Sequence, residues 1–222
     1  QTLCGGRAVY EACVKLRQDL DSRPWQPGEE RRAEYYYACD PCFAIGDFEG
    51  AKKRGAKYRN FPAYAYATQA AIVEVDRETG EVRLLKVIAA HDVGRAINPH
   101  IIEGQMHGSC SMGQGYALTE GYPTENGYPV KTLYRQLGLP RAEDTPDYEI
   151  ILIEDPEPQG PFGAKGISEV ATVPVTPAIL NAVSRAIGVR INKVPASPEV
   201  VLEAIRTGKC GVLTMEQQIK EL

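Results

Sequence analysis

The spacing of apolar residues along the chain switches between a helical period and a strand period. From residue 7 to residue 20 apolar side chains recur every three or four positions, which predicts an amphipathic helix. Residues 21–32 are rich in proline and charge and predict a connection. Residues 66–75 and 82–90 are β-branched and partly alternating. The turn residues between them, with Gly80, predict an antiparallel hairpin.

A second helix is predicted to begin at His100, because Asn98 and Pro99 suit its cap and first position. Gly104 and Gly108 lie four residues apart on one face of this helix. Glycine costs helix stability there, so we expect another backbone to approach that face closely.

The last third of the chain predicts a strand, a glycine-rich loop and two more helices. The strand covers YEIILIEDPEP and leads directly into GPFGAKGISE. One helix is predicted to open at Thr176-Pro177 and stop at Gly188; the other opens at Ser197-Pro198 and stops at Gly208. Strands and helices mix without regular alternation, so the expected fold class is α+β.

Composition narrows the range of functions. The 222 residues carry a formal net charge of -4 and give a pI near 5.5, so no basic field favours a nucleic-acid partner. No apolar run is long enough to cross a bilayer and no secretory pattern opens the chain, so we expect a cytoplasmic protein without a membrane partner. The chain begins with glutamine, which suggests a fragment or a processed subunit.

The six cysteines are scattered, unlike those of a disulfide scaffold. Cys39 and Cys42 form a lone CxxC, and zinc would need a second pair or nearby histidines, of which the chain has three. We therefore expect reduced thiols and no metal ligated by these side chains. His107 is interpreted as packed or exposed, and the neighbours His91 and Asp92 as structural, with Asp92 in a turn.

The loop GPFGAKGISE fits neither common phosphate-binding pattern. It has no hydroxyl directly after Lys165, as a P-loop needs, and its glycines are evenly spaced by three, unlike a dinucleotide fingerprint. What remains is a backbone that can approach something closely, with Glu169 just beyond it. Glu169 is either a general base or a solvent-facing or capping residue, and local chemistry alone favours the second. Lys165 could offset its charge or hold a backbone carbonyl.

Several motifs together resemble a known family. GGRAVYEAC, EVDRETGEVRLLKVIAAHDVGRAINPHIIEGQ, GQGYALTE, GPFGAKGISE and VPVTPAILNAV occur in the order found in the molybdenum-binding subunit of the xanthine dehydrogenase and aldehyde oxidoreductase family. The resemblance spans about residues 1–206. It implies that residues 1–208 form the C-terminal half of the molybdopterin-binding domain, followed by a tail at 209–222.

The resemblance also implies a function and its cofactors. Glu169 takes the place of the family's catalytic base in the oxidative hydroxylation of an N-heteroaromatic compound or an aldehyde. The cofactor is a molybdenum-pterin, with or without a cytosine dinucleotide, and electrons leave through iron-sulfur centres and FAD on partner domains or subunits. The cofactor contacts implied for this chain are Thr2, Met112, Gly113, Gln114 and Ser168.

This sequence departs from the family pattern at several points. Met112 stands where many relatives have a cofactor-bonding glutamine, and a thioether cannot donate that bond. Gln114 would point to another face of the helix. Ser168 replaces a frequent glycine, and Val170 a frequent proline.

The upstream motifs that build the other wall of the site are absent from the chain. We therefore expect half a site that needs the other half of the molybdenum domain as its partner, and no cofactor binding or turnover by the isolated chain. The aromatic runs Tyr35-Tyr36-Tyr37 and FPAYAY are interpreted as core or interface. Alternative functions are an aromatic thioester reductase on the same scaffold and a non-catalytic interaction module.

Overall fold

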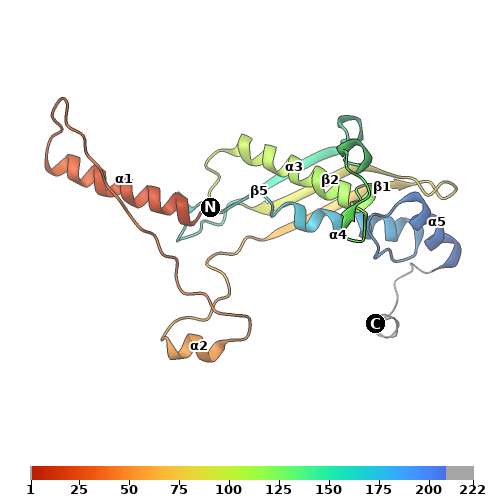
Figure 1. Cartoon of the computed structure of the whole chain (residues 1–222), viewed down its shortest axis with the longest axis horizontal. Coiled ribbons are helices and arrows are strands. Elements are labelled where there is room, and N and C mark those ends of the chain that lie inside the picture. The colour runs from red at the N-terminus through yellow and green to blue at the C-terminus, as the bar shows by residue number, and fades with distance from the viewer. Residues whose placement is uncertain (1, 209–222) are drawn as a thin grey trace. The chain divides into compact units, whose positions relative to one another are not determined.

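The structure, a computed structural model that describes residues 2–208, combines α-helices with a small three-stranded sheet (Figure 1). The helices are α1 (Cys4–Ser22), α2 (Phe48–Lys53), α3 (Pro99–Leu118), α4 (Thr172–Ile187) and α5 (Pro198–Thr207). The strands are β1 (Ala67–Val75), β2 (Val82–Asp92), β3 (Thr124–Glu125), β4 (Tyr128–Pro129) and β5 (Asp147–Ile153). Short 3₁₀ turns are η1 (Tyr134–Gln136), η2 (Ala142–Asp144) and η3 (Pro161–Gly163). This mixture confirms the α+β class.

The main sheet has the strand order β1-β2-β5, and a separate small ladder joins β3 to β4. β1 and β2 are antiparallel, with Ala67 opposite His91 and Val75 opposite Val82, and the register shifts between Ile72 and Val73. The predicted hairpin is therefore confirmed. Along β1 every second residue is partly shielded, so the strand turns one face toward the interior.

Contacts within the described chain divide it into two units. The first contains residues 2–66, Asp92–Pro99 and Leu152–Gly166; the second contains Ala67–His91, His100–Ile151 and residues 167–208. In the second unit α4 packs on β1, and Figure 1 shows α3 and α4 alongside the sheet. Its core is made of fully buried aliphatic and sulfur-containing side chains, which supply most of its folding free energy at about 1.5–3 kcal/mol for a large apolar residue. They include Val87, Ala89, Met106, Cys110, Val175, Ile179 and Val183.

Most predicted helices are present, but α4 begins earlier than predicted. Its first residue is Thr172, and Pro177 lies inside the helix. Proline there removes one backbone donor near the helix start, and the prediction treated it as the start itself. A tertiary contact supports this turn, because the Thr176 hydroxyl donates to the Gly113 carbonyl on α3 at 2.8 Å. The predicted stops at Gly188 and Gly208 are confirmed as left-handed C-caps.

Within residues 2–208 the expected close approach at Gly104 and Gly108 is not present. A Cβ at either position would meet nothing within 4 Å. The close approach is at Gly113, where a Cβ would overlap the Val175 side chain of α4. Gly104 and Gly108 lie on the exposed face of α3, whereas Gly113 lies on its buried face. Helical spacing alone does not tell which side of the helix faces its neighbour.

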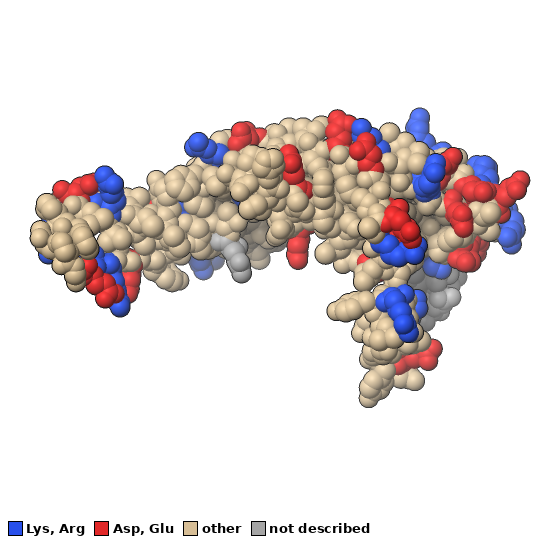
Figure 2. Space-filling view, turned by 90° about the horizontal axis from the view of Figure 1, so that it is seen from above, with Lys and Arg blue, Asp and Glu red and all other residues tan. Residues whose placement is uncertain are grey.

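The first unit has little core of its own. Among residues 2–66 only Phe43 and Ala51 are buried, and α1 buries no residue. Tyr35, Tyr36, Phe61, Tyr64 and Tyr66 are exposed, so the core interpretation is wrong for them and the interface interpretation stays a prediction. Tyr37 is partly buried, and its hydroxyl donates to the Gln159 side chain at 3.0 Å. On the face seen in Figure 2 acidic and basic side chains are interspersed.

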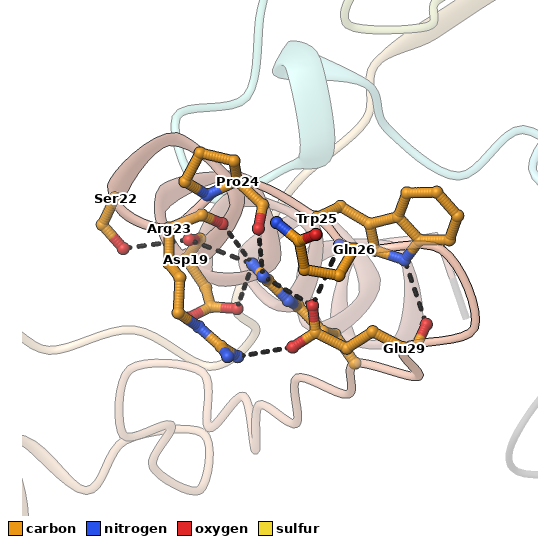
Figure 3. Close-up of polar contacts among 8 residues, drawn as sticks. Asp19, Ser22, Arg23, Pro24, Trp25, Gln26 and Glu29 are labelled. Atoms are coloured by element: carbon orange, nitrogen blue, oxygen red, sulfur yellow. Dashed lines mark hydrogen bonds and ion pairs between the residues drawn. The ribbon is translucent and has the colours of Figure 1, made fainter.

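Polar contacts hold the C-terminal end of α1 in place of apolar packing. The Arg31 guanidinium, 6% exposed, donates to the carbonyl oxygens of Asp19, Arg23 and Pro24 and to the carboxylates of Asp19 and Glu29. Figure 3 shows these carbonyls and carboxylates gathered at one point. The hydrogen bond from Arg31 lowers the pKa of Glu29 to about 2. The Asp19 carbonyl lies in the last turn of α1 and also accepts from the Arg23 amide, and the other two carbonyls belong to the residues that follow the helix.

The last two predictions concern the C-terminal tail and membrane-spanning helices. The predicted tail at 209–222 lies outside the described residues, so the boundary at residue 208 stays a prediction. Among residues 2–208 no helix has both the length and the apolar character needed to cross a membrane.

Candidate functional site

Glu169 lies on an exposed turn directly before α4. The turn covers residues 168–171, and both Ser168 and Glu169 are exposed, whereas Ala171 is fully buried. The Glu169 backbone carbonyl accepts a hydrogen bond from the Thr172 amide at 3.0 Å. The N-cap position of α4 is Ala171, without a side-chain cap, so Glu169 presents its carboxylate to the outside instead of capping the helix.

Two side chains from other elements hold this turn by its backbone. The Ser109 hydroxyl on α3 donates to the Ser168 carbonyl at 2.7 Å. The Gln69 amide on β1 donates to the Ala171 carbonyl at 2.9 Å. The Thr172 hydroxyl donates in return to the Ser109 carbonyl at 3.3 Å. The turn that carries Glu169 is thus attached to both the sheet and α3.

Gln69 is itself oriented by a buried histidine. Its Nε2 lies 2.7 Å from Nε2 of His91, a residue that is 1% exposed. Because an amide nitrogen can only donate, this His91 nitrogen accepts and the ring proton is on Nδ1. Burial lowers the pKa of His91 below its ordinary value, which keeps the ring neutral and able to accept. Burial also raises the pKa of Cys110, next to the same amide, to about 11.

The three neighbouring candidates on α3 point in different directions. Met112 is 45% exposed. Its sulfur lies 4.0 Å from the hydroxyl of Thr172, the first residue of α4 and three residues after Glu169. Gly113 packs against α4. Gln114 is 6% exposed, and its amide nitrogen donates to the Asp144 carbonyl at 2.8 Å. Met112 and Gly113 therefore lie beside the start of α4, whereas Gln114 faces elsewhere, as its helical position predicted.

The first unit contains Thr2 and the glycine-rich loop. Thr2 is an exposed turn residue. The Lys165 side chain is 6% exposed and forms an ion pair with Asp92, whose side chain is 5% exposed, and a longer one with Asp155 at 3.4 Å. Neither role expected for Lys165 is seen: its ammonium group pairs with carboxylates other than Glu169. Burial disfavours its charge, but the hydrogen bonds and charges of Asp92 and Asp155 raise the pKa of Lys165 overall.

The same loop approaches its own chain closely. The Lys165 amide donates to the Val93 carbonyl, and the Arg95 amide donates to the Gly163 carbonyl. Gly94 has φ +65°, and a Cβ on it would overlap the Gly163 carbonyl oxygen. The prediction that Asp92 is a turn residue was wrong, because Asp92 is the last residue of β2; its side chain accepts from the Gly94 amide at 3.0 Å and so holds the turn that follows. The close backbone approach predicted for this loop is thus to residues 93–95.

The cavity and the CxxC thiols involve different residues. A cavity of about 1230 Å³ lies between the β1–β2 turn, the end of α3 and residues 138–147, and of the site candidates only Gln114 lines it. Cys39 and Cys42 are free thiols. Within the described chain no three His, Cys, Asp or Glu side chains are grouped so that they could hold a metal ion.

Comparison with known proteins assigns this arrangement to a family. A model of the molybdopterin cofactor-binding domain matches residues 1–146, about two thirds of the chain. This chain belongs to the molybdopterin cofactor-binding domain family. The match ends before Glu169, so the role of that residue does not follow from it.

Individual relatives of this cofactor-binding domain cover different shares of the chain. The aldehyde oxidoreductase molybdenum-binding subunit PaoC of Escherichia coli O157:H7 is 30% identical over 210 residues, 89% of this chain and 29% of that protein. The xanthine dehydrogenase molybdenum-binding subunit of the same organism is 35% identical over 131 residues, 58% of this chain and 17% of that protein.

The likeness holds in three dimensions. The crystal structure of the aldehyde oxidoreductase from Desulfovibrio desulfuricans matches with a TM-score of 0.71 and 28% identity, over 91% of this chain and 22% of that one. The matched part of the chain thus spans between about a sixth and a third of the length of these relatives.

The residues present fit one side of a molybdopterin. On α3, Gly104, Gly108 and Met112 follow at four-residue steps, and the two glycines leave open space where a Cβ would stand. Met112 and Ser168 are exposed beside the Glu169 turn. A flat ring system could lie on such a surface without displacing side chains. The Met112 thioether cannot donate to it, so hydrogen bonds from this side would come from Ser168.

Sequence reasoning missed Gln69 and Ser109. The signal for Gln69 was present, because residues 67, 69, 71, 73 and 75 of β1 face the interior and Gln69 alone among them is polar. A single polar residue on an apolar strand face needs hydrogen-bond partners. No comparable signal marked Ser109, since a serine in a helix commonly faces solvent or bonds its own backbone.

Proposed function

We propose that this chain forms one side of the molybdopterin site of a molybdenum hydroxylase, with Glu169 as its general base. The observation that carries the proposal is an exposed carboxylate on a turn held from two sides, beside an open face of α3, in a chain of this family. When bound, the molybdenum-pterin would accept the electrons removed from the substrate.

The chain's own residues would bind, orient and move a proton. Gly104, Gly108, Met112 and Ser168 would lie against one side of the cofactor. A Glu169 carboxylate oxygen would accept a proton from the water-derived oxygen that attacks the substrate carbon. This requires that the carboxylate lies within hydrogen-bond reach of that proton. Glu169 is exposed in this chain, so a reacting group can come within that distance of its side chain.

The relatives suggest the substrate class. Those reported above are named as a xanthine dehydrogenase and as aldehyde oxidoreductases, so an N-heteroaromatic compound or an aldehyde is proposed for the enzyme that contains this chain. Because those proteins are several times longer, the rest of the cofactor site is proposed to come from a segment like their remainder. Thr2 and Gln114 are proposed as cofactor contacts on resemblance alone, and iron-sulfur and FAD partners likewise.

Replacing the base tests this function. In the complete enzyme, Glu169→Gln keeps the shape of the side chain and removes its ability to accept a proton. We expect turnover to fall by about 10²–10⁴-fold, the usual contribution of a general base. The measurements are kcat and KM with aldehydes and N-heteroaromatic compounds, together with molybdenum content.

The matched control is Glu203→Gln, the same change at an exposed position of α5. It should leave turnover and molybdenum content unchanged. Full turnover of the Glu169→Gln enzyme would refute the base assignment and favour a non-catalytic module. Reduction of an aromatic thioester without any hydroxylation would favour the reductase alternative.

A further inference from the structure

We propose that Gln69 and Ser109 are positioning residues that orient Glu169 through the two backbone carbonyls on either side of it. The proposal rests on the proposed function, because the orientation of Glu169 matters for turnover only if Glu169 is the base. Neither residue is expected to touch substrate.

The first bond acts on the peptide group directly before Glu169, and the second acts on the peptide group between Ala171 and Thr172, at the end of the turn. The Ser168 carbonyl, which accepts from Ser109, belongs to the same planar peptide unit as the Glu169 nitrogen. The Ala171 carbonyl, which accepts from Gln69, lies at the other end of the turn. Fixing both ends leaves few combinations of φ and ψ for the residues between them.

The donors come from two different elements that are themselves well anchored. Ser109 is buried on α3, and Gln69 lies on β1, which pairs with β2 along its length. The turn therefore cannot shift relative to α3 without breaking one bond, nor relative to the sheet without breaking the other. Ser168 and Glu169 are both exposed, so apolar packing does not hold these two residues in place.

The Gln69 amide nitrogen has an acceptor for each of its hydrogens, whereas its buried oxygen has no hydrogen-bond partner within the described chain. One is directed at the Ala171 carbonyl and the other at Nε2 of His91. A side chain with both donors engaged cannot rotate away from the turn without losing two bonds in a buried setting, where an unmade bond is costly. His91 thus orients Gln69, and Gln69 holds the turn.

A purely structural role makes a different prediction from a positioning role. If the bonds only join α3, α4 and the sheet, their loss lowers the stability of the whole unit and leaves the chemistry of the folded enzyme unchanged. If they orient the base, their loss loosens residues 168–172 and lowers kcat with little effect on KM, because displacement of a reacting group by about 1 Å can cost as much as 10²-fold.

The experiment uses the complete enzyme with Ser109→Ala and, separately, Gln69→Met. Hydrogen exchange of residues 168–172 and steady-state kinetics are measured below the unfolding temperature. We expect exchange there to become about tenfold faster, and kcat to fall about tenfold with KM unchanged within about twofold, as for loss of one well-made hydrogen bond. Ser109→Thr, which keeps the hydroxyl, should recover most of kcat.

The control is Ser184→Ala, which removes a hydroxyl at the other end of α4 that donates to the Leu180 carbonyl at 2.6 Å. It should alter neither exchange at 168–172 nor kcat. Normal kcat in both Ser109→Ala and Gln69→Met would overturn the proposal, whether or not stability changes. If Gln69→Met does not fold, Ser109→Ala alone decides.

The two proposals fail in distinguishable ways. Full turnover by Glu169→Gln refutes the proposed function, and the positioning proposal falls with it. Lost turnover in Glu169→Gln together with normal kcat in Ser109→Ala refutes positioning alone.

Discussion

Lys165 of the glycine-rich loop pairs with Asp92 and thereby helps to hold the loop that contains it. Both side chains are buried and paired, and the backbone bonds between residues 93–95 and 163–165 surround the pair. A buried ion pair adds little net stability, but removing one partner leaves a charge without water or counterion. The conformation of the GPFGAKG loop therefore depends on both residues.

Replacement of Lys165 by methionine should release this loop. We expect a loss of about 3 kcal/mol of local stability, because Asp92 would be left buried and unpaired. The measurement is hydrogen exchange at the backbone amides of residues 94, 95 and 165. The double variant Lys165→Met with Asp92→Asn should recover most of the loss, since asparagine is uncharged and its carbonyl can still accept from the Gly94 amide. An equally unstable double variant would contradict this account.

His91 makes a second prediction at the residue scale, through pH. Burial lowers its pKa in the folded state below the ordinary 6.5, so the unfolded state binds the proton first as pH falls. The free energy of unfolding should therefore decrease as pH falls from about 6.5 toward 5, by up to about 1.4 kcal/mol for each unit by which folding lowers the pKa. Cys110, with its pKa raised to about 11, does not titrate in this range.

Denaturant unfolding at several pH values tests the histidine. His91→Gln keeps an acceptor for Gln69 and cannot titrate, so it should flatten this part of the pH dependence. His100→Gln changes a histidine whose ring is almost fully exposed and should leave it as it was. An unchanged slope in His91→Gln would exclude His91 as its source.

At this scale the sequence predicted which residue types mattered better than it predicted their partners. Glu169 and Met112 are both exposed, and the Met112 sulfur lies beside the first residue of α4, the helix that follows Glu169. Gln114 faces elsewhere, as the helical period required. The partner of Lys165 lies 73 residues away in the chain, and that of Gln69 lies 102 away. Such pairs depend on how elements meet, which local periodicity does not encode.

At the scale of elements, α3 and α4 meet where a glycine permits it. A Cβ on Gly113 would overlap Val175, which is fully buried and cannot move aside. The Gly113 carbonyl also accepts from the Thr176 hydroxyl, so a side chain of α4 is bonded to the backbone of α3 at this point. The start of α4, directly after Glu169, is thereby fixed against α3.

The same substitution at two glycines of α3 should have opposite effects. Gly113→Ala should lower the free energy of unfolding by about 1–3 kcal/mol through overpacking. Gly104→Ala, in open space on the exposed face, should raise it by about 0.5–1 kcal/mol through helix propensity. Thermal or urea unfolding compares them directly. A stabilising Gly113→Ala would mean that the two helices are not in close contact there.

Element types were predictable because each shows its period within a single segment. The helix over residues 7–20, the hairpin and the strand before the glycine loop all follow from apolar spacing, and the structure has them. The start of α4 was not predictable, because its first turn contains no capping side chain and is held by contacts from α3 and β1.

At the scale of the whole molecule, the two units differ in how far they are self-sufficient. The second has a core of buried aliphatic side chains between its helices and sheet. The first leaves most aromatic residues of positions 2–66 exposed. The solved relative is more than four times as long as the part matched by this chain, which agrees with an interface for these aromatics.

The sequence by itself determined four of the helices, the hairpin and the strand before the glycine loop, the α+β class and, through ordered motifs, the molybdopterin-binding family, because these depend on local period and on residue order; it did not predict α2 or the β3–β4 ladder. Only the tertiary structure decided that Gly113 is the contact between helices, that Lys165 pairs with Asp92, and that Gln69 and Ser109 hold the turn of Glu169. Each of these joins residues far apart in the chain through directional bonds or steric fit, and folding alone brings them within reach.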